Sequence, residues 1–485
     1  QMPVFLTREI VNISGVWRAI NIYQASDLKG RPVIVAVDIK TGEAFAWNAQ
    51  DLLHSNIPNT ASVAGVVEAK GTLLSPTGSD HGPTAPLPLQ HAKVFDDKGR
   101  VVAITDDNGA FKVPAGTQSS MKLTIRLDGE YAAVIDDEAS RNGPVEVSLS
   151  ATPGQTMRAL LNPLGDNAEK TAAGNGYFYY SHMISWLKAA ARMSDKRIEV
   201  PLAGGIRVNR HDMPGNAYFN PANDSINPQK EAVVVVRGRD GRPVKLRFEN
   251  TAQPSILEHE GTHRVVHQVS QIELTVEQAA VAAFRFVLRI MDPVMDSGVN
   301  EAIADTVSMF MRNCPLIGEG FILNPPAGAP AYIRTGENKT QYDPKNSDPH
   351  AEGESFMGFT WMVHQGLIEA LGQEAGTAYA ALLIVPTTIY SQPKDVTTAA
   401  QHVMLADMTS DGRIPNEAMI RESAQAHGVS LPDVSPGLGV AAAEIQGTVA
   451  ASLSSERSAP KGALAAAAGP AQYPARNEPI VVNDA

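Results

Sequence analysis

The chain has almost no cysteine, no long apolar run and no dense run of basic residues. Cys314 is the single cysteine among 485 residues, so an intrachain disulfide and a thiolate metal site are both excluded. No apolar run reaches the roughly 18 residues that a transmembrane helix needs. The formal net charge of -12, with scattered lysines and arginines, disfavours a nucleic-acid partner. Any metal site must therefore use histidine and carboxylate ligands.

A secretion signal is also missing from the sequence. The chain opens at Gln1 without a basic segment or an apolar core, which indicates a signal peptide that is absent or already removed. With 43% hydrophobic and 19% charged residues, the composition is typical of a soluble globular protein. A length of about 150 residues per domain predicts roughly three domains.

The apolar pattern changes along the chain and predicts an α+β multidomain protein. Alternating apolar residues over 1–60 indicate a small β unit, and short strands separated by Asn-Gly and Asp-Gly turns over 61–152 indicate a β-sandwich. A β-rich stretch follows over 153–254 and a helical stretch over 255–435. The Ala-rich segment 436–485 has little periodicity and is interpreted as a flexible tail.

Two stretches allow finer predictions of secondary structure. Residues at helical spacing predict a helix from Ala168 to Met193, and short β-rich runs predict strands near 206–208, 217–219 and 233–236. From Ser255 to about Ser423 the pattern is helical almost without interruption. Ser255 and Glu258 have the spacing of a capping box, so the first of these helices is predicted to begin with Ser255 as its N-cap.

The strongest chemical signal is the motif His259-Glu260-Gly261-Thr262-His263 in the second turn of that helix. Histidines four residues apart project from one helical face, about 5–6 Å apart at Cβ, which suits two imidazoles on one zinc ion. Zinc catalysis also needs a carboxylate beside the attacking water, and Glu260 is placed for that role. The alternative is a solvated helix whose charges carry no function.

A third ligand is predicted in the motif Asn300-Glu301-Ala302-Ile303-Ala304-Asp305, on another helix. Catalytic zinc takes three protein ligands and keeps one open position, and Glu301 is the candidate for the third. Asp305 lies four residues later on the same face, where it can accept the free ring N–H of a ligating histidine. His267 is a competing histidine, but one helix brings only two such residues to one ion.

The motifs HEGTH and NEAIAD resemble the zinc site of the thermolysin family, a gluzincin family, and of the related fungalysin family, over roughly residues 160–435. The resemblance implies a catalytic unit with a β-rich lobe and a helical lobe, with zinc bound by His259, His263 and Glu301. It also implies an edge strand at 215–219, in which Asn216 and Ala217 contact the substrate backbone.

The same resemblance implies roles for two later residues. The segment 348–354 looks like the fungalysin form of a histidine motif, so His350 would stabilise the oxyanion. Arg334 stands where these families often have an arginine that meets a substrate carbonyl, and a surface arginine is the alternative. The chain departs from thermolysin in the 37 residues between His263 and Glu301, which contain no tyrosine and include an inserted segment, 269–299.

Weaker resemblances cover the upstream part of the chain. Residues 17–47 are similar to the last propeptide strands of secreted members of these families, and residues 63–116 to a carboxypeptidase regulatory-like β-sandwich. The first similarity implies a secreted or extracellular protein whose pro-segment awaits cleavage. The segments 106–108 and 223–224 are candidates for calcium binding, and the alternative is that they serve only as turns.

Together these observations predict a secreted zinc endopeptidase with a peptide or protein substrate. Glu260 would remove a proton from water and deliver it to the leaving amine, while zinc and His350 would hold the oxyanion. An edge strand that keeps the peptide extended favours cleavage of internal bonds. Two alternatives stay open: a non-catalytic binding protein that acts through the β-sandwich, and a zinc exopeptidase.

Overall fold

The computed structural model describes four strand backbones within residues 1–61 and, in full, most of residues 62–432. Within 62–432 the described residues exclude 76, 81, 115–118, 139–142, 155, 164, 166, 194–204, 238–241, 271–294, 326–327, 347 and 410. The predicted insertion 269–299 therefore lies mostly outside the described residues, and the predicted tail 436–485 lies wholly outside them.

The first unit is a four-stranded antiparallel sheet in the order β1-β2-β3-β4, in which every strand pairs with the next one along the chain. Its strands are β1 Val4–Ile13, β2 Val16–Ser26, β3 Pro32–Asp38 and β4 Ala44–Asn48. This sheet belongs to a compact unit separate from the rest of the chain. Its similarity to a propeptide stays a prediction.

The second unit begins with a β-sandwich, which matches the short strands predicted there. One sheet has the order β12-β10-β7-β8, and the other has the order β13-β5-β6 with β9 also paired to β5. Buried and partly exposed residues alternate along β5 and β10, so each sheet turns one face to the core. The strands are β5 Ser62–Thr72, β6 Thr84–Pro88, β7 Ala92–Phe95, β8 Val101–Ile104, β9 Ala110–Pro114, β10 Met121–Gly129, β12 Glu146–Ala151 and β13 Thr156–Leu160.

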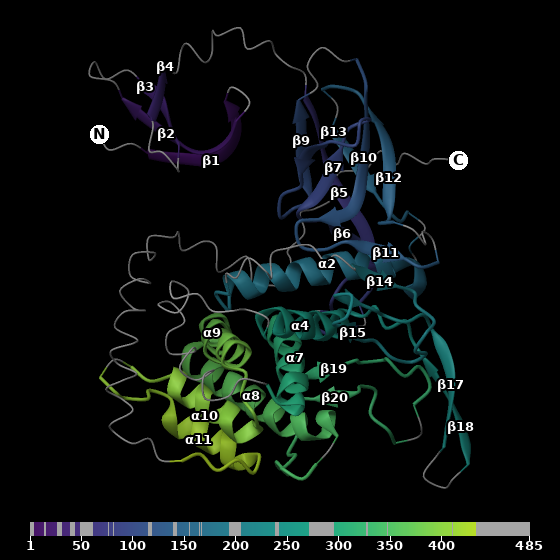
Figure 1. Cartoon of the computed structure of the whole chain (residues 1–485), viewed down its shortest axis with the longest axis vertical. Coiled ribbons are helices and arrows are strands. Elements are labelled where there is room, and N and C mark those ends of the chain that lie inside the picture. Colours follow the sequence, from purple (N-terminus) through teal and green to yellow (C-terminus); the bar gives the residue numbers. More distant parts are fainter. Residues whose placement is uncertain are drawn as a thin grey trace. The chain divides into compact units, whose positions relative to one another are not determined.

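Helix α2, Ala168–Ala189, confirms the helix predicted to start at Ala168. The side chain of Asn167 caps it by accepting the N–H of Lys170. Figure 1 shows α2 between the sandwich strands and helices α4 and α7, and it packs against β6 on one side and α4 on the other. Apolar side chains of the sandwich, α2 and the later helices form one continuous core.

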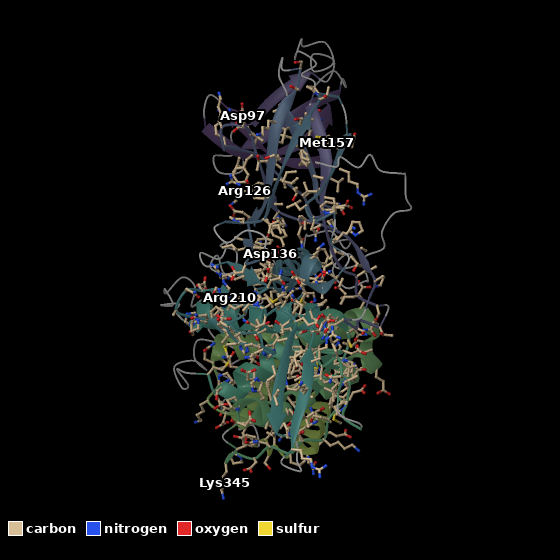
Figure 2. All side chains as sticks on the ribbon, turned by 90° about the vertical axis from the view of Figure 1, so that its right-hand side faces the viewer. Asp97, Arg126, Asp136, Met157, Arg210 and Lys345 are labelled. Atoms are coloured by element: carbon tan, nitrogen blue, oxygen red, sulfur yellow. The ribbon has the colours of Figure 1, made fainter. Side chains whose placement is uncertain are left out.

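A second small sheet follows the sandwich, in the order β11-β14-β16-β15. The first three strands are parallel and β15 is antiparallel at the edge. Figure 2 shows Asp136, at the end of β11, and Arg210, two residues after β14, lying between Met157 of the sandwich and Lys345. The strands are β11 Val134–Asp136, β14 Ile206–Val208, β15 Phe219–Asn220 and β16 Ser225–Ile226, followed by the hairpin β17 Ala232–Arg237 and β18 Pro243–Phe248.

The remaining described part is mainly helical, and α4, α7, α8 and α9 pack against one another in chain order. The helices are α4 Pro254–Ser270, α7 Ser297–Arg312, α8 Pro349–Leu371, α9 Gln373–Ser391, α10 Val396–Ala406 and α11 Glu417–Ala426. The prediction of almost continuous helix is wrong for 313–348, where the described residues form the short pair β19 Leu316–Ile317 and β20 Arg334–Thr335 and an isolated bridge from Ile322 to Phe248. Asn313 ends α7 in a left-handed conformation, and Pro315 follows it.

The described residues form seven helices and several small sheets, which confirms the α+β class. None of the described helices combines the length and the apolar character that crossing a bilayer requires. The finer expectation of a thermolysin-like catalytic unit concerns the site, whose geometry follows.

Candidate metal centre

Helix α4 carries the HExxH motif, and its start differs from the prediction. Ser255 is not the N-cap, because the helix begins at Pro254. The N–H of Ser255 donates to Oδ1 of Asp80 at 3.0 Å, and its hydroxyl donates to Oδ2 of the same carboxylate. Glu258 does not close a capping box either, since its buried carboxylate accepts from Ser308 and Arg312 of α7. A distant aspartate therefore caps the helix.

The three predicted ligands come together where α4 faces α7. The ligand atoms of His259, His263 and Glu301 all lie within 4.8 Å of one another. The two Nε2 atoms are 3.0 Å apart, and Oε2 of Glu301 is 3.2 Å from the first and 3.5 Å from the second. Among the described residues, this is the one group of three or more His, Cys, Asp and Glu side chains that could hold a metal ion.

The far ring nitrogen of each histidine has an acceptor. Nδ1 of His259 donates to Oδ1 of Asp305 at 2.7 Å, and Nδ1 of His263 donates to Oδ1 of Asn300 at 3.1 Å. Carboxylate and amide oxygens accept hydrogen bonds, so these partners hold the proton on Nδ1 and leave the Nε2 lone pair for a ligand. The role of Asp305 was predicted. Asn300 was missed, although it directly precedes Glu301 in the same motif.

Three electron-rich atoms thus converge on one point. Oε2 of Glu301 is buried, and the Nε2 atoms of His259, His263 and His350 lie 3.2–3.5 Å from it without the alignment of a regular hydrogen bond. A buried carboxylate needs a positive partner, which either a protonated imidazole or a metal ion can supply. Two imidazoles and one carboxylate are a donor set that catalytic zinc accepts. The residues present therefore fit a divalent metal ion and are compatible with zinc.

The electrostatics of the cluster favour positive charge. Burial lowers the pKa of His259, but Asp305 and Glu301 outweigh this effect and raise it to about 10. Burial raises the pKa of Glu301, but the neighbouring histidines hold it well below its ordinary value. Because the site stabilises a proton on an imidazole this strongly, it also attracts a metal cation, which replaces that proton on binding.

Arg334, on β20, supports the cluster from behind. Its Nε and Nη2 atoms donate to the two oxygens of Asp305 at 2.6 and 2.9 Å. Only 12% of the Arg334 side chain is exposed, so the alternative of a surface arginine is wrong. Burial raises the pKa of Asp305, but Arg334 and His259 lower it well below its ordinary value. The described contacts of Arg334 hold Asp305, and contact with a substrate stays a prediction.

Glu260 and His350 complete the immediate surroundings. Glu260 is buried, and its charge is among those that raise the pKa of Arg334. His350 comes from the first turn of α8, where Asp348 caps the helix. Its Nε2 atom is 3.2 Å from Oε2 of Glu301, and 52% of its side chain is exposed. His350 therefore approaches the ligand cluster from the solvent side.

The predicted substrate strand is shorter than expected. Only Phe219–Asn220 form β15, because Gly215 has a φ of 75° and the N–H of Asn216 donates to Met213 in a turn. Asn216 is exposed just before this edge strand, whereas Ala217 is buried against apolar neighbours. The ring of Phe219 lies 5.6 Å from that of His267, so the edge strand runs beside α4. Contact of Asn216 and Ala217 with substrate stays a prediction.

The two candidate calcium segments have other structural roles. Asp106 accepts the N–H groups of Asn108 and Ala110 within its turn. Asp224 pairs with the buried Arg264 at 3.1 Å and accepts from a neighbouring glutamine of α4. Within the described part of the chain, neither carboxylate joins a group of three possible ligands.

Comparison with known proteins adds no family. No protein-family model matches the chain, and no curated protein matches it. The function is therefore inferred from the chemistry of the site. The structure brings together His259, His263, Glu301, Asp305, Arg334 and His350. Glu260 directly follows His259 in α4, and Asn216 and Ala217 lie just before the edge strand.

Proposed function

We propose that this chain is a secreted zinc-dependent endopeptidase of the thermolysin and fungalysin type. One observation supports the proposal most directly: two imidazole nitrogens and a carboxylate oxygen of Glu301 converge within 4.8 Å, and Glu260 directly follows the first ligand. His259, His263 and Glu301 would hold the ion. When bound, zinc supplies a Lewis acid that polarises a carbonyl oxygen and makes a water molecule more acidic.

Glu260 is the general base of this proposal. It is buried in α4 directly after the ligand His259, and its charge acts on the nearby Arg334. A carboxylate in that state can accept a proton from water and later deliver it to the leaving amine. A structural metal site closes all four coordination positions with protein ligands and has no need of such a base. Glu260 therefore favours catalysis over a purely structural or binding role.

His350 and the edge strand would act on the substrate. His350 is half exposed on the solvent side of the ligands, so its imidazole can donate to a negatively charged oxygen that develops there. Edge strand β15 lies beside α4 and can pair with an extended peptide backbone near Asn216. A peptide held along a strand continues past both sides of the cleaved bond. An endopeptidase is therefore favoured over an exopeptidase.

Replacing the proposed base tests this function. Glu260→Gln keeps the shape of the side chain but cannot accept the proton, so casein hydrolysis should fall by a factor of about 10² to 10⁴. Zinc content, measured by atomic absorption, should stay at the wild-type level because the ligands are intact. Glu374→Gln, an exposed change on α9, is the matched control and should keep full activity.

Two outcomes would contradict the proposal. Undiminished hydrolysis by Glu260→Gln would exclude the mechanism, and a wild-type protein that never retains zinc would exclude the site. A peptide blocked at both ends separates the two kinds of peptidase. An endopeptidase cleaves it internally, whereas an exopeptidase leaves it intact.

A further inference from the structure

Polar contacts between α4 and α7 continue well beyond the metal ligands. His263 contacts Asn300 near the start of α7, and Ser255 accepts from Ser308 more than two turns later, so the two helices run antiparallel. The hydroxyl of Ser308 also donates to Oε2 of Glu258 at 2.8 Å. The residues that fix the two helices against each other therefore reach from the ligands to the first turn of α4.

Arg312 lies at the centre of the far end of this interface. Its side chain is 1% exposed, and its Nε atom is 3.2 Å from Oε2 of Glu258. Its Nη1 atom donates to the carbonyl of Gly78 at 3.0 Å and lies 3.7 Å from Oδ1 of Asp80. Buried charges of this kind persist only when each is paired and hydrogen-bonded. The cluster therefore fixes its members firmly.

The loop between β5 and β6 supplies Asp80, so one member of this cluster comes from the β-sandwich. Both carboxylate oxygens of Asp80 accept from Ser255, in the first turn of α4. A second link lies nearby, since Asn175 of α2 accepts the N–H of Thr72 and donates to the carbonyl of Ala252. The end of β5 and the start of α4 are thus joined twice.

We propose that Asp80 is a positioning residue for the metal centre, and this proposal rests on the proposed function. Asp80 fixes Ser255, one helical turn before His259 on the same face of α4. Glu258 and Arg312 then fix that turn against α7, which carries Glu301. Because ligand geometry must hold within about 0.5 Å, a small shift of α4 along α7 separates the ligands. In this proposal, the β-sandwich helps to set the geometry of the metal ligands through Asp80.

Metal affinity tests this role without a peptidase assay. In the full chain, Asp80→Ala should weaken zinc binding about tenfold, the lower range for residues that orient ligands, and should shift the visible absorption bands of the cobalt-substituted protein. Asp80→Asn keeps an acceptor for the N–H of Ser255, so a loss of about threefold is expected. Zinc affinity is measured by competition with a chromophoric chelator.

The matched control is Asp96→Ala. Asp96 is also a buried carboxylate of the sandwich, but it accepts only from Lys98 and Arg100 within its own hairpin. This variant should melt at a lower temperature than the wild type and still bind zinc and cobalt as the wild type does. A loss of sandwich stability is thereby separated from a loss of ligand positioning.

The proposal is overturned if Asp80→Ala binds zinc as tightly as the wild type with the same cobalt spectrum. Should Asp80→Ala not fold, the nearly isosteric Asp80→Asn decides, and unchanged affinity in that variant overturns the proposal equally. A wild-type chain that binds no zinc rejects the proposed function as well. Zinc binding that ignores Asp80 rejects the positioning role alone.

Discussion

The two ends of the α4–α7 interface gather negative or electron-rich groups and satisfy them differently. At one end the carboxylates of Asp80 and Glu258 surround Arg312, a cation that the chain itself provides. At the other end Oε2 of Glu301 lies 3.2–3.5 Å from the ring nitrogens of three histidines, His259, His263 and His350. The first end has its own cation, whereas the second could hold a metal ion.

Along this one pair of helices, the Arg312 end contributes mainly to stability, and the ligand end carries the proposed function. Burying a charge without a partner is unfavourable, so a fold tolerates it mainly where a bound ligand compensates for the lost solvation. Arg312 closes its end and holds the helices in place. The ligand end places a carboxylate oxygen against histidine nitrogens, an arrangement that could hold a metal ion. Arg312 therefore holds in place the two helices that carry the candidate metal ligands.

Removing the permanent cation should have the largest effect on folding. Arg312→Met leaves Glu258 and Asp80 buried without their positive partner, and losing one member of a buried ion cluster typically costs about 3–5 kcal/mol. Urea denaturation of the metal-free protein measures this loss. Glu301→Gln, at the other end, should cost less, because the histidines that face its carboxylate can lose their protons when that charge is removed.

Zinc affinity should be affected in the opposite order, with a larger loss in Glu301→Gln than in Arg312→Met. Glu301→Gln removes a ligand and should abolish tight binding, whereas Arg312→Met, where it stays folded, keeps all three ligands. If Glu301→Gln destabilised the metal-free chain more than Arg312→Met, the distinction between a structural end and a functional end would be wrong.

The two histidines differ in how they are supported, and this difference predicts a smaller effect. Asp305 holds Nδ1 of His259 with a charged oxygen and is itself fixed by Arg334, whereas Asn300 holds His263 with a neutral amide. Asp305→Asn should therefore lower zinc affinity about 10–100-fold. Asn300→Ser should lower it by less than about tenfold. Equal losses in chelator competition would show that the charge of Asp305 contributes nothing.

The ligand cluster could be predicted because helical geometry is local. Four-residue spacing places His259 and His263 on one face of a helix, and the same spacing relates Glu301 to Asp305. The structure brings the three predicted ligands together as a group that could hold a metal ion. Nothing beyond the sequence of two short segments was needed for that prediction.

The supports of the cluster could not be predicted, because they come from far along the chain. The cap of α4 is Asp80, 175 residues before Ser255, so a local capping box was inferred wrongly. Arg334 reaches Asp305 from a segment that was expected to be helical and is not. Tertiary contacts of this kind leave no periodic pattern in a sequence.

The smallest expected difference between the two ends is in how stability depends on pH, through Glu258 at one end and His259 at the other. Burial raises the pKa of Glu258 from 4.5 to about 8 in spite of Arg312. A carboxyl whose pKa is higher in the folded state binds more protons there than in the unfolded chain. The contribution of Glu258 to the free energy of unfolding therefore falls as pH rises from about 4.5 to about 8, with or without zinc. Glu258→Gln should remove that component.

At the ligand end, the stabilisation that zinc provides should increase as pH rises. In the metal-free protein the pKa of His259 is raised from 6.5 to about 10, so its contribution to stability is full below pH 6.5 and is lost as pH rises toward 10. Zinc binding must displace that proton, which becomes easier as pH rises. The increase in melting temperature on adding zinc should therefore grow between about pH 6.5 and 9 in the Glu258→Gln background. If the increase in melting temperature caused by zinc stayed constant between about pH 6.5 and 9, His259 would already be neutral without the metal.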